Sequence, residues 1–164
     1  MTEFTDVRVT VRVGAYILRK NTQGLYQILL FQHPDDSEAP IQVPGGGVDR
    51  GEEIEAALHR EIWEESGLRH LKIWRKLGKS ETCWIYPRKQ VSHRHLYLLL
   101  APPAELPDTW EHIVQGTGVD AGMRFWYFWD RPSREFTIPG GLGAFLNPES
   151  IPELYDITSD DHRG

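Results

Sequence analysis

The sequence predicts a layered α/β protein with a mixed β-sheet. Apolar segments typical of strands lie both before and after one strongly amphipathic helical segment at residues 54–67, and weaker helical segments follow near the C-terminus. The 164 residues are enough for one domain that buries about two thirds of its unfolded surface. We therefore expect a single domain at residues 1–158 and a charged, disordered tail at residues 159–164.

Two strands and a glycine-rich loop are predicted ahead of the helix. In residues 7–18, apolar residues alternate with polar ones, which predicts a strand with one buried face, formed by Val7, Val9, Val11 and Val13. Arg8 and Arg12 fall on the other face, where they are either solvated or line the mouth of a site. Residues 25–32 predict a second strand, and Val43 leads into a loop of one proline and three glycines.

After the helix, apolar segments alternate with breaks rich in Pro and Gly. The expected strands are an edge strand at 71–80, a short segment at 82–87, a central and most apolar strand at 94–101, and an aromatic strand at 123–129. A loop rich in Pro, Asp and Gly is expected at residues 102–122. Short helical segments are expected at 142–146 and 151–155.

The composition argues against several classes of protein. A net charge of −6 disfavours nucleic-acid binding, which relies on Lys and Arg contacts to phosphates, so we expect no DNA partner. No apolar run approaches the roughly 20 residues of a membrane span, and no signal pattern opens the chain, so we expect no membrane partner and a cytoplasmic location. Cys83 is the only cysteine, which excludes an internal disulfide and a cysteine metal cluster.

The helix carries an acidic face. Glu61, Glu64 and Glu65 are three and four residues apart, so their carboxylates lie on one side of a helix. Like charges at this spacing repel by a few tenths of a kcal/mol per pair. A hard divalent cation would reverse the sign, because Mg²⁺ and Mn²⁺ take oxygen ligands. The pattern therefore predicts a site for Mg²⁺ or Mn²⁺.

The residues around the acidic face fit a site held by packing. An apolar stripe lies beside it, formed by Ile54, Leu58 and Ile62. Arg60 lies four residues before Glu64 and can pair with it, and Gly67 is placed to end the helix in the left-handed conformation. The glycines at 45–47 leave the backbone free to approach a metal or a phosphate.

Together these residues resemble the Nudix box, the signature of the Nudix hydrolase family. The pattern is Gly, five residues, Glu, seven residues, then Arg-Glu-aliphatic-any-Glu-Glu-any-Gly-aliphatic, and this chain fits it at every position. The matching residues are Gly46, Glu52, Arg60, Glu61, Ile62, Glu64, Glu65, Gly67 and Leu68. The resemblance implies the Nudix fold, a mixed β-sheet between α-helices, with the box forming a loop-helix-loop on one side.

The resemblance also implies an activity. Family members hydrolyse a nucleoside diphosphate linked to another group X: water attacks one phosphorus while divalent metal ions neutralise the developing charge. The implied metal ligands are Glu61, Glu64 and Glu65, with a backbone carbonyl of Gly45 or Gly46. One of the carboxylates could also take the proton from the attacking water.

The remaining catalytic candidates follow from the same resemblance. Arg60 would orient a box carboxylate, and Glu52 would brace the loop-helix-loop. Many members place a further glutamate outside the box, on a loop after the central strand, as general base or extra ligand. Glu111 is the candidate here, with Glu105 and Asp120 behind it.

The sequence gives weaker indications of the residues that select the group X. Tyr86 lies where diadenosine polyphosphate hydrolases carry a tyrosine, and Pro87 lies near a proline of ADP-ribose pyrophosphatases, so these two pointers conflict. Candidates to face the site from strands are Arg12 and Arg94, the latter between His93 and His95. The tryptophans are expected in the core or a hydrophobic lid, although one could stack on a nucleobase: Trp84, Trp110, Trp126 and Trp129.

The sequence thus predicts a Mg²⁺- or Mn²⁺-dependent pyrophosphohydrolase of a small nucleotide, either a nucleoside di- or triphosphate or a dinucleoside polyphosphate. Within enzymes, the alternatives are removal of pyrophosphate from the 5′ end of RNA, which the acidic charge disfavours, and cleavage of an ADP-sugar. The alternative from another class is a non-catalytic nucleotide-binding regulator, against which the complete box counts. Family members are often homodimers, so a homodimer is expected.

Overall fold

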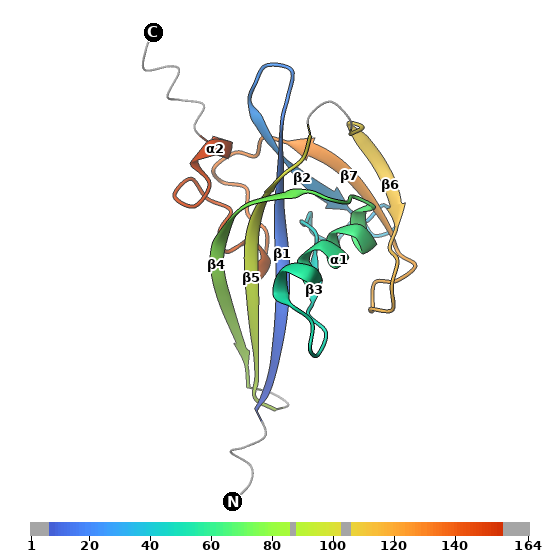
Figure 1. The fold of residues 1–164 in the computed structure, drawn as a ribbon, viewed down its shortest axis with the longest axis vertical. Coiled ribbons are helices and arrows are strands. Elements are labelled where there is room, and N and C mark those ends of the chain that lie inside the picture. Colours follow the sequence, from blue (N-terminus) through green and yellow to red (C-terminus); the bar gives the residue numbers. More distant parts are fainter. Residues whose placement is uncertain (1–6, 86–87, 103–105, 156–164) are drawn as a thin grey trace, which may run out of the picture.

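The computed structural model describes residues 7–85, 88–102 and 106–155 (Figure 1). Its elements are β1 (Arg8–Lys20), β2 (Tyr26–Gln32), β3 (Gly45–Gly47), α1 (Ile54–Ser66), β4 (Lys72–Trp84), β5 (Gln90–Leu100), β6 (Thr109–Ile113), β7 (Arg124–Asp130), the 3₁₀ turn η2 (Gly141–Gly143) and α2 (Pro152–Tyr155). The predicted tail at 159–164 lies outside the described residues. No helix in the described part of the chain is long and apolar enough to cross a membrane.

The strands form one mixed sheet in the order β4-β5-β1-β2-β7-β6, with β3 paired to β1 beside this path. β1 and β5 run parallel, whereas the other pairs are antiparallel. The predicted mixed sheet is therefore confirmed. β4 lies at the edge, as predicted, and β5 lies between β4 and β1, inside the sheet.

Alternation along the strands builds a core on each face of the sheet. Val13, Ala15 and Ile17 of β1 belong to the core under α1, whereas Tyr16 and Leu18 belong to the core on the opposite face. The chain after β7, with η2 and α2, covers this second core (Figure 1). The sheet thus lies between α1 and the C-terminal segment.

The helix α1 forms as its sequence predicts. It buries Ala57, Leu58 and Ile62 against the sheet. It ends at Gly67, which has a φ of 82° and whose backbone N–H donates to the carbonyl oxygen of Trp63 at 2.9 Å. The predicted left-handed cap is confirmed, and the buried stripe directs the acidic face toward β3.

Polar side chains of the sheet, among them Arg75 and Tyr16, hold the C-terminal segment. Arg75 of β4 donates to both carboxylate oxygens of Glu153 at 2.9 and 3.0 Å, which fixes the predicted helix α2. The hydroxyl of Tyr16 donates to the carbonyl oxygen of Leu142 at 2.7 Å and accepts from the N–H of Phe145 at 3.3 Å. Because this carbonyl bonds to a side chain instead of to a later N–H, the helix predicted at 142–146 is reduced to the turn η2.

Two predicted loops are strands. The glycines of β3 pair with β1, and a Cβ on Gly45 would lie 2.6 Å from the carbonyl oxygen of Val13, so the absence of side chains permits this pairing. β6 lies within the predicted loop at 102–122 and pairs with β7. The segments predicted separately at 71–80 and 82–87 join in one strand, β4, which pairs with β5 up to Trp84.

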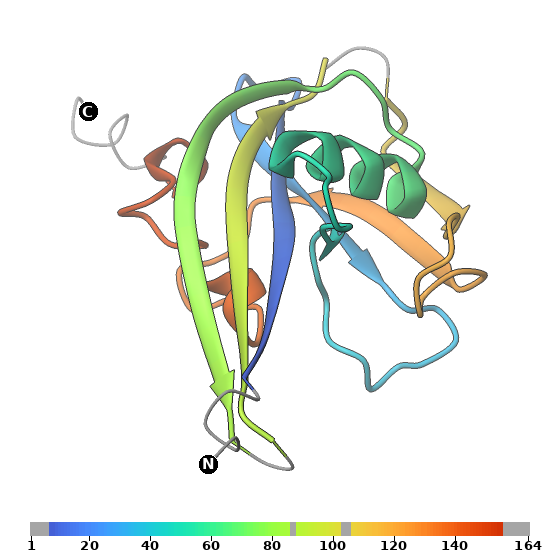
Figure 2. The same cartoon turned by 60° about the horizontal axis from the view of Figure 1, so that its bottom comes forward.

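The ends of three strands extend beyond the two cores. We call this part the ribbon: residues 8–12 of β1, 80–84 of β4 and 90–94 of β5 (Figure 2). On it, Val9 is 56% exposed, and Val7 before it is 38% exposed. The expected buried face at these two valines is therefore wrong, because the layer that covers the sheet at Val13 does not reach the tip of the ribbon.

Candidate active site

Arg60 of α1 lies at the centre of the charged contacts. Its Nε and Nη2 donate to the two carboxylate oxygens of Glu52 at 2.8 and 2.9 Å. Its Nη1 donates to Glu61 at 3.0 Å and to Glu64 at 3.2 Å, so the predicted Arg60 and Glu64 pair is confirmed. Its Nη2 also donates to the carbonyl oxygen of Gly47 at 2.8 Å. One guanidinium therefore joins β3, the following loop and the helix.

Glu52 closes the loop that precedes the helix. Its Oε1 accepts from the backbone N–H of Asp49 at 2.9 Å, in addition to the contact with Arg60. The hydrogen bonds from Arg60 hold the pKa of Glu52 below its ordinary value. Glu52 therefore stays ionised and contacts the acidic face through Arg60.

The three box carboxylates are crowded away from water. The side chains of Glu61 and Glu64 are 13% and 16% exposed, and Glu65 is buried. Glu65 accepts a hydrogen bond from the N–H of Gly45 at 3.1 Å. Burial raises the pKa of Glu65 to about 8, with the neighbouring charges of Glu61 and Asp120 adding to the shift, and burial also raises the pKa of Glu61.

Two glycines make room for these carboxylates. A Cβ on Gly46 would overlap the carboxylate of Glu61, which accounts for a glycine at this position of the box. Gly116, with a φ of 93°, approaches Glu64 so closely that a Cβ there would lie 2.6 Å from its Cδ. Sequence reasoning missed Gly116, since no local pattern links it to a residue so far away in the chain.

Side chains from β6 and β7 cap the C-terminal end of α1. Their partners are the last carbonyl oxygens of the helix: Glu64 O lies 3.0 Å from His112 Nε2, Glu65 O accepts from Tyr127 Oη at 2.9 Å, and Ser66 O accepts from Trp110 Nε1 at 3.0 Å. A helix end leaves such acceptors without partners, and here the sheet supplies them. The contacts fix the residues that carry the acidic face, and Trp110 is packed as predicted.

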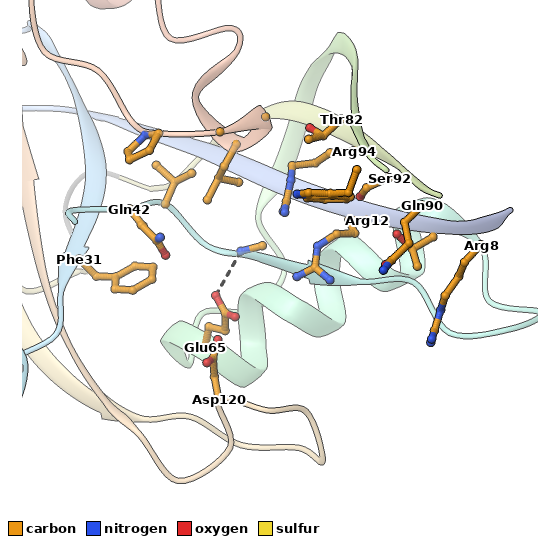
Figure 3. A pocket seen from close by; sticks show the side chains of 18 residues that line it. Arg8, Arg12, Phe31, Gln42, Glu65, Thr82, Gln90, Ser92, Arg94 and Asp120 are labelled. Carbon is orange, nitrogen blue, oxygen red and sulfur yellow. Dashed lines mark hydrogen bonds between the residues drawn. The ribbon is translucent and has the colours of Figure 1, made fainter. Parts of the chain in front are cut away.

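Two adjoining cavities open beside the acidic face. The smaller has a volume of about 330 Å³ and lies between β3, α1 and residues 114–121. The larger has a volume of about 570 Å³ and lies over the ribbon, with residues 139–142 on its rim (Figure 3). Arg12, Gly45, Glu65 and Asp120 line both, so these residues mark the junction.

The structure brings most predicted site residues to these cavities. The smaller one is lined by Arg12, Gly45, Gly46, Arg60, Glu61, Glu64 and Glu65. The larger one is lined by Arg12 and Arg94, which are paired neighbours on β1 and β5. Arg94 donates to the carbonyl oxygen of Val13 at 3.2 Å, and burial lowers its pKa to about 10, with Arg12 adding to the shift. Arg94 therefore remains cationic at neutral pH.

Glu111 does not reach the site. It lies on β6, where it pairs with Arg124 at 3.2 Å, and it lines neither cavity. Asp120, which sequence reasoning ranked behind it, lies at the junction opposite Glu65 (Figure 3). The cavities are thus lined by Asp120 and not by Glu111, because Glu111 lies on the strand β6, and a catalytic role for a loop acid stays a prediction.

The remaining residues that the sequence offered as site candidates lie in the core, on the strands or outside the described residues, and one of them lines the larger cavity. Tyr86, Pro87 and Glu105 lie outside the described residues. His93 and His95 alternate with Arg94 on β5 and line neither cavity. Trp129 is buried and Trp126 stacks on Phe128, with ring centroids 5.3 Å apart, whereas Trp84 lines the larger cavity.

The donor chemistry at the smaller cavity fits a hard divalent cation. The carboxylates that line it are those of Asp49, Glu61, Glu64, Glu65 and Asp120. In residues 7–85, 88–102 and 106–155, however, no three acidic or other ligating side chains converge on one point, and Arg60 bonds to two of these carboxylates. Cation binding therefore requires Glu61 and Glu64 to turn from Arg60 toward the cavity.

Comparison with known proteins identifies the family. The NUDIX domain model matches residues 8–127. The RNA pyrophosphohydrolase of Roseobacter denitrificans is 37% identical over 68 residues, covering 42% of this chain and 41% of that protein. The one of Rhodopseudomonas palustris is 36% identical over 90 residues, covering 52% and 48%. The chain thus spans less than half the length of these curated relatives.

A solved structure supports the fold. The E. coli dihydroneopterin triphosphate pyrophosphohydrolase is 17% identical and superposes with a TM-score of 0.51, over 92% of this chain and 95% of that one. At this identity the likeness concerns the fold alone, and the predicted Nudix fold is confirmed. Because the NUDIX match covers well over half of the chain, this protein belongs to the Nudix hydrolase family.

Proposed function

We propose that this chain is a divalent-metal-dependent pyrophosphohydrolase that cleaves a nucleoside diphosphate linked to a group X. The observation that carries the proposal is the junction of two cavities of opposite charge. Glu61 and Glu64 of α1 line only the smaller cavity and Arg94 lines only the larger one, whereas Arg12 and Glu65 lie at the junction and line both. A pyrophosphate at the junction would meet cationic side chains on one side and metal-binding carboxylates on the other.

The residues divide into holding and positioning roles. Glu61, Glu64 and Glu65 hold Mg²⁺ or Mn²⁺, with a carbonyl of Gly45 or Gly46 as a further ligand. The bound ion would neutralise charge on the phosphate oxygens and favour ionisation of water. Arg60 and Glu52 hold α1, the loop before it and β3 in fixed positions relative to one another.

The chemical step needs one proton acceptor. The water oxygen forms a bond to phosphorus, the P–O bond of the anhydride breaks, and the leaving phosphate keeps the electron pair. We assign the proton of the water to Asp120, since the three box carboxylates serve as metal ligands and Asp120 lies at the junction of the two cavities. Arg12 and Arg94 contact the phosphates that stay with the nucleoside.

The favoured substrates are nucleoside di- and triphosphates and dinucleoside polyphosphates. A cavity of about 570 Å³ has the size of a small-molecule site. A second candidate is RNA 5′-pyrophosphate removal, which the names of the two curated relatives support. The net charge of −6 counts against a long RNA partner. An ADP-sugar substrate, the homodimer and the cytoplasmic location stay predictions.

The test is phosphate release from a panel of nucleotides, dinucleoside polyphosphates, ADP-sugars and 5′-triphosphorylated RNA, with Mg²⁺ or Mn²⁺. We expect turnover of at least one small nucleotide, at least 100-fold slower in Glu64→Gln. Turnover confined to RNA would favour the second candidate. Nucleotide binding without turnover of any panel member would support a non-catalytic regulator instead.

A further inference from the structure

The ribbon presents an ordered set of polar side chains on one face. Strand register places them in three rows that each cross β1, β5 and β4: an inner row of Arg12, Arg94 and Ser80, a middle row of Thr10, Ser92 and Thr82, and an outer row of Arg8, Gln90 and Trp84. All of these except Ser80 line the larger cavity. The rows are two residues apart on every strand, so one face carries all three.

The chemistry changes from row to row. The inner row, beside the box glycines, carries two guanidinium groups. The middle row carries three hydroxyl groups and no charge, and Ser92 in it is only 6% exposed. The outer row carries the guanidinium of Arg8 on β1, the amide of Gln90 on β5 and, on β4, the indole of Trp84, which is 48% exposed. Two steps of two residues at about 3.3 Å per residue separate the inner and outer rows by about 13 Å.

This order matches one nucleotide laid out from phosphate to base. We propose that the ribbon binds the nucleoside of the substrate, with a phosphate between Arg12 and Arg94, the sugar hydroxyls on the middle row, and the nucleobase stacked on Trp84 beside the amide of Gln90. This inference rests on the proposed function for the position of the cleaved bond. It adds the class of group that the larger cavity takes and names Trp84 as a specificity-determining residue.

The charge pattern distinguishes a nucleoside from a longer phosphate chain. A track for successive backbone phosphates needs cationic side chains at each step, whereas the middle row has none. Hydroxyl groups suit the sugar, which both donates and accepts hydrogen bonds. An indole suits the flat face of a base, and such stacking contributes about 1–3 kcal/mol per base.

The walls of the cavity support the same occupant. Gly141 packs over the ribbon, where a Cβ would lie 2.7 Å from the hydroxyl oxygen of Ser80, and this hydroxyl donates to the Gly141 carbonyl oxygen at 3.1 Å. Phe31 and Gln42 line the same cavity from the other side of the junction (Figure 3). The inner row is therefore enclosed, while the exposed Trp84 leaves the outer row accessible to a flat group.

Equilibrium binding to the full chain tests this proposal without depending on turnover. Glu64→Gln serves as the background, so that hydrolysis does not consume the probe. The probes are the four common nucleoside triphosphates and inorganic tripolyphosphate, which has the phosphates without a nucleoside, measured by calorimetry with Mg²⁺. The added variants are Trp84→Ala, Trp84→Phe and, as matched control, Ile85→Ala, since Ile85 is 81% exposed and lines neither cavity.

We expect Trp84→Ala to weaken binding of at least one nucleoside triphosphate about 10-fold or more and to leave tripolyphosphate unchanged. Trp84→Phe should retain most of the affinity, and Ile85→Ala should change neither. The inference is overturned if no nucleoside triphosphate binds more tightly than tripolyphosphate, or if Trp84→Ala weakens both kinds of probe equally. Base-dependent binding by a protein whose wild type shows no turnover would instead refute the proposed function and leave the nucleoside site standing.

Discussion

The contact between Gly116 and Glu64 yields the sharpest prediction about the acidic face. Gly116→Ala places a Cβ 2.6 Å from the Cδ of Glu64, whereas ordinary contact begins at 3.4 Å. The Glu64 carboxylate must therefore retreat by about 0.8 Å, and a displacement near 1 Å in an active site can lower the rate on the order of 100-fold. The φ of 93° also strains any residue with a side chain, at about 1–2 kcal/mol.

Gly122→Ala separates the two effects. Gly122 lies in the same loop with a φ of 89°, yet a Cβ there would meet nothing within 4 Å. Urea unfolding should show a similar loss of about 1–2 kcal/mol in both variants. Phosphate release with saturating Mg²⁺ should fall about 30- to 100-fold only in Gly116→Ala. Equal kcat values for the two variants would refute the claim that the loop positions Glu64.

Three further predictions concern other charged groups. Asp120→Asn should lower kcat on the order of 100-fold, whereas Glu111→Gln should change it less than about 2-fold; the reverse order in steady-state assays would restore Glu111 as the loop acid. Arg60→Lys keeps the charge but loses the two-pronged contact, so urea unfolding should show a loss of about 1–2 kcal/mol, and an unchanged midpoint would contradict that role. The hydrogen bond from Arg75 lowers the pKa of Glu153 in the folded state below its ordinary value. The ion pair therefore stabilises the fold fully above the unfolded-state pKa of Glu153. This stabilisation is lost as the pH falls through the lowered, folded-state pKa. The free energy difference between wild type and Glu153→Gln should therefore be about 0.5 kcal/mol at pH 7 and should disappear once the pH is below the lowered pKa of Glu153, and a difference that persists with Glu153 protonated would exclude the ion pair as its source.

Local sequence signals were sufficient for the helix and for most strands. The spacing of Ile54, Leu58 and Ile62 sets the buried side of α1, and Gly67 marks its end, because both depend on residues within two helical turns. The pairing between strands that are distant in the chain could not be predicted from local sequence patterns. β3 forms because the glycines can approach Val13 of β1, a contact that no pattern near residue 45 encodes.

The same limit explains the outcome at the site. The box spacing placed Arg60 and Glu64 together correctly, since a helix fixes residues four apart. The choice between Glu111 and Asp120 depends on β6 being a strand, and the segment around it has the composition of a loop. The rows of the ribbon likewise depend on the register between β1, β4 and β5. Trp84 could therefore not be distinguished from the other tryptophans by sequence alone.

The central claim is that the carboxylates of α1 hold a divalent cation that hydrolysis requires. Its most direct test is the rate of phosphate release from the best nucleotide substrate as Mn²⁺ is raised from zero, in wild type and in Glu64→Gln. The account predicts a saturable rise in the wild type, abolished by EDTA, and a rate at least 100-fold lower in the variant at the same Mn²⁺ concentrations. A wild-type rate that is independent of Mn²⁺ and Mg²⁺, or an undiminished rate in Glu64→Gln, would contradict it.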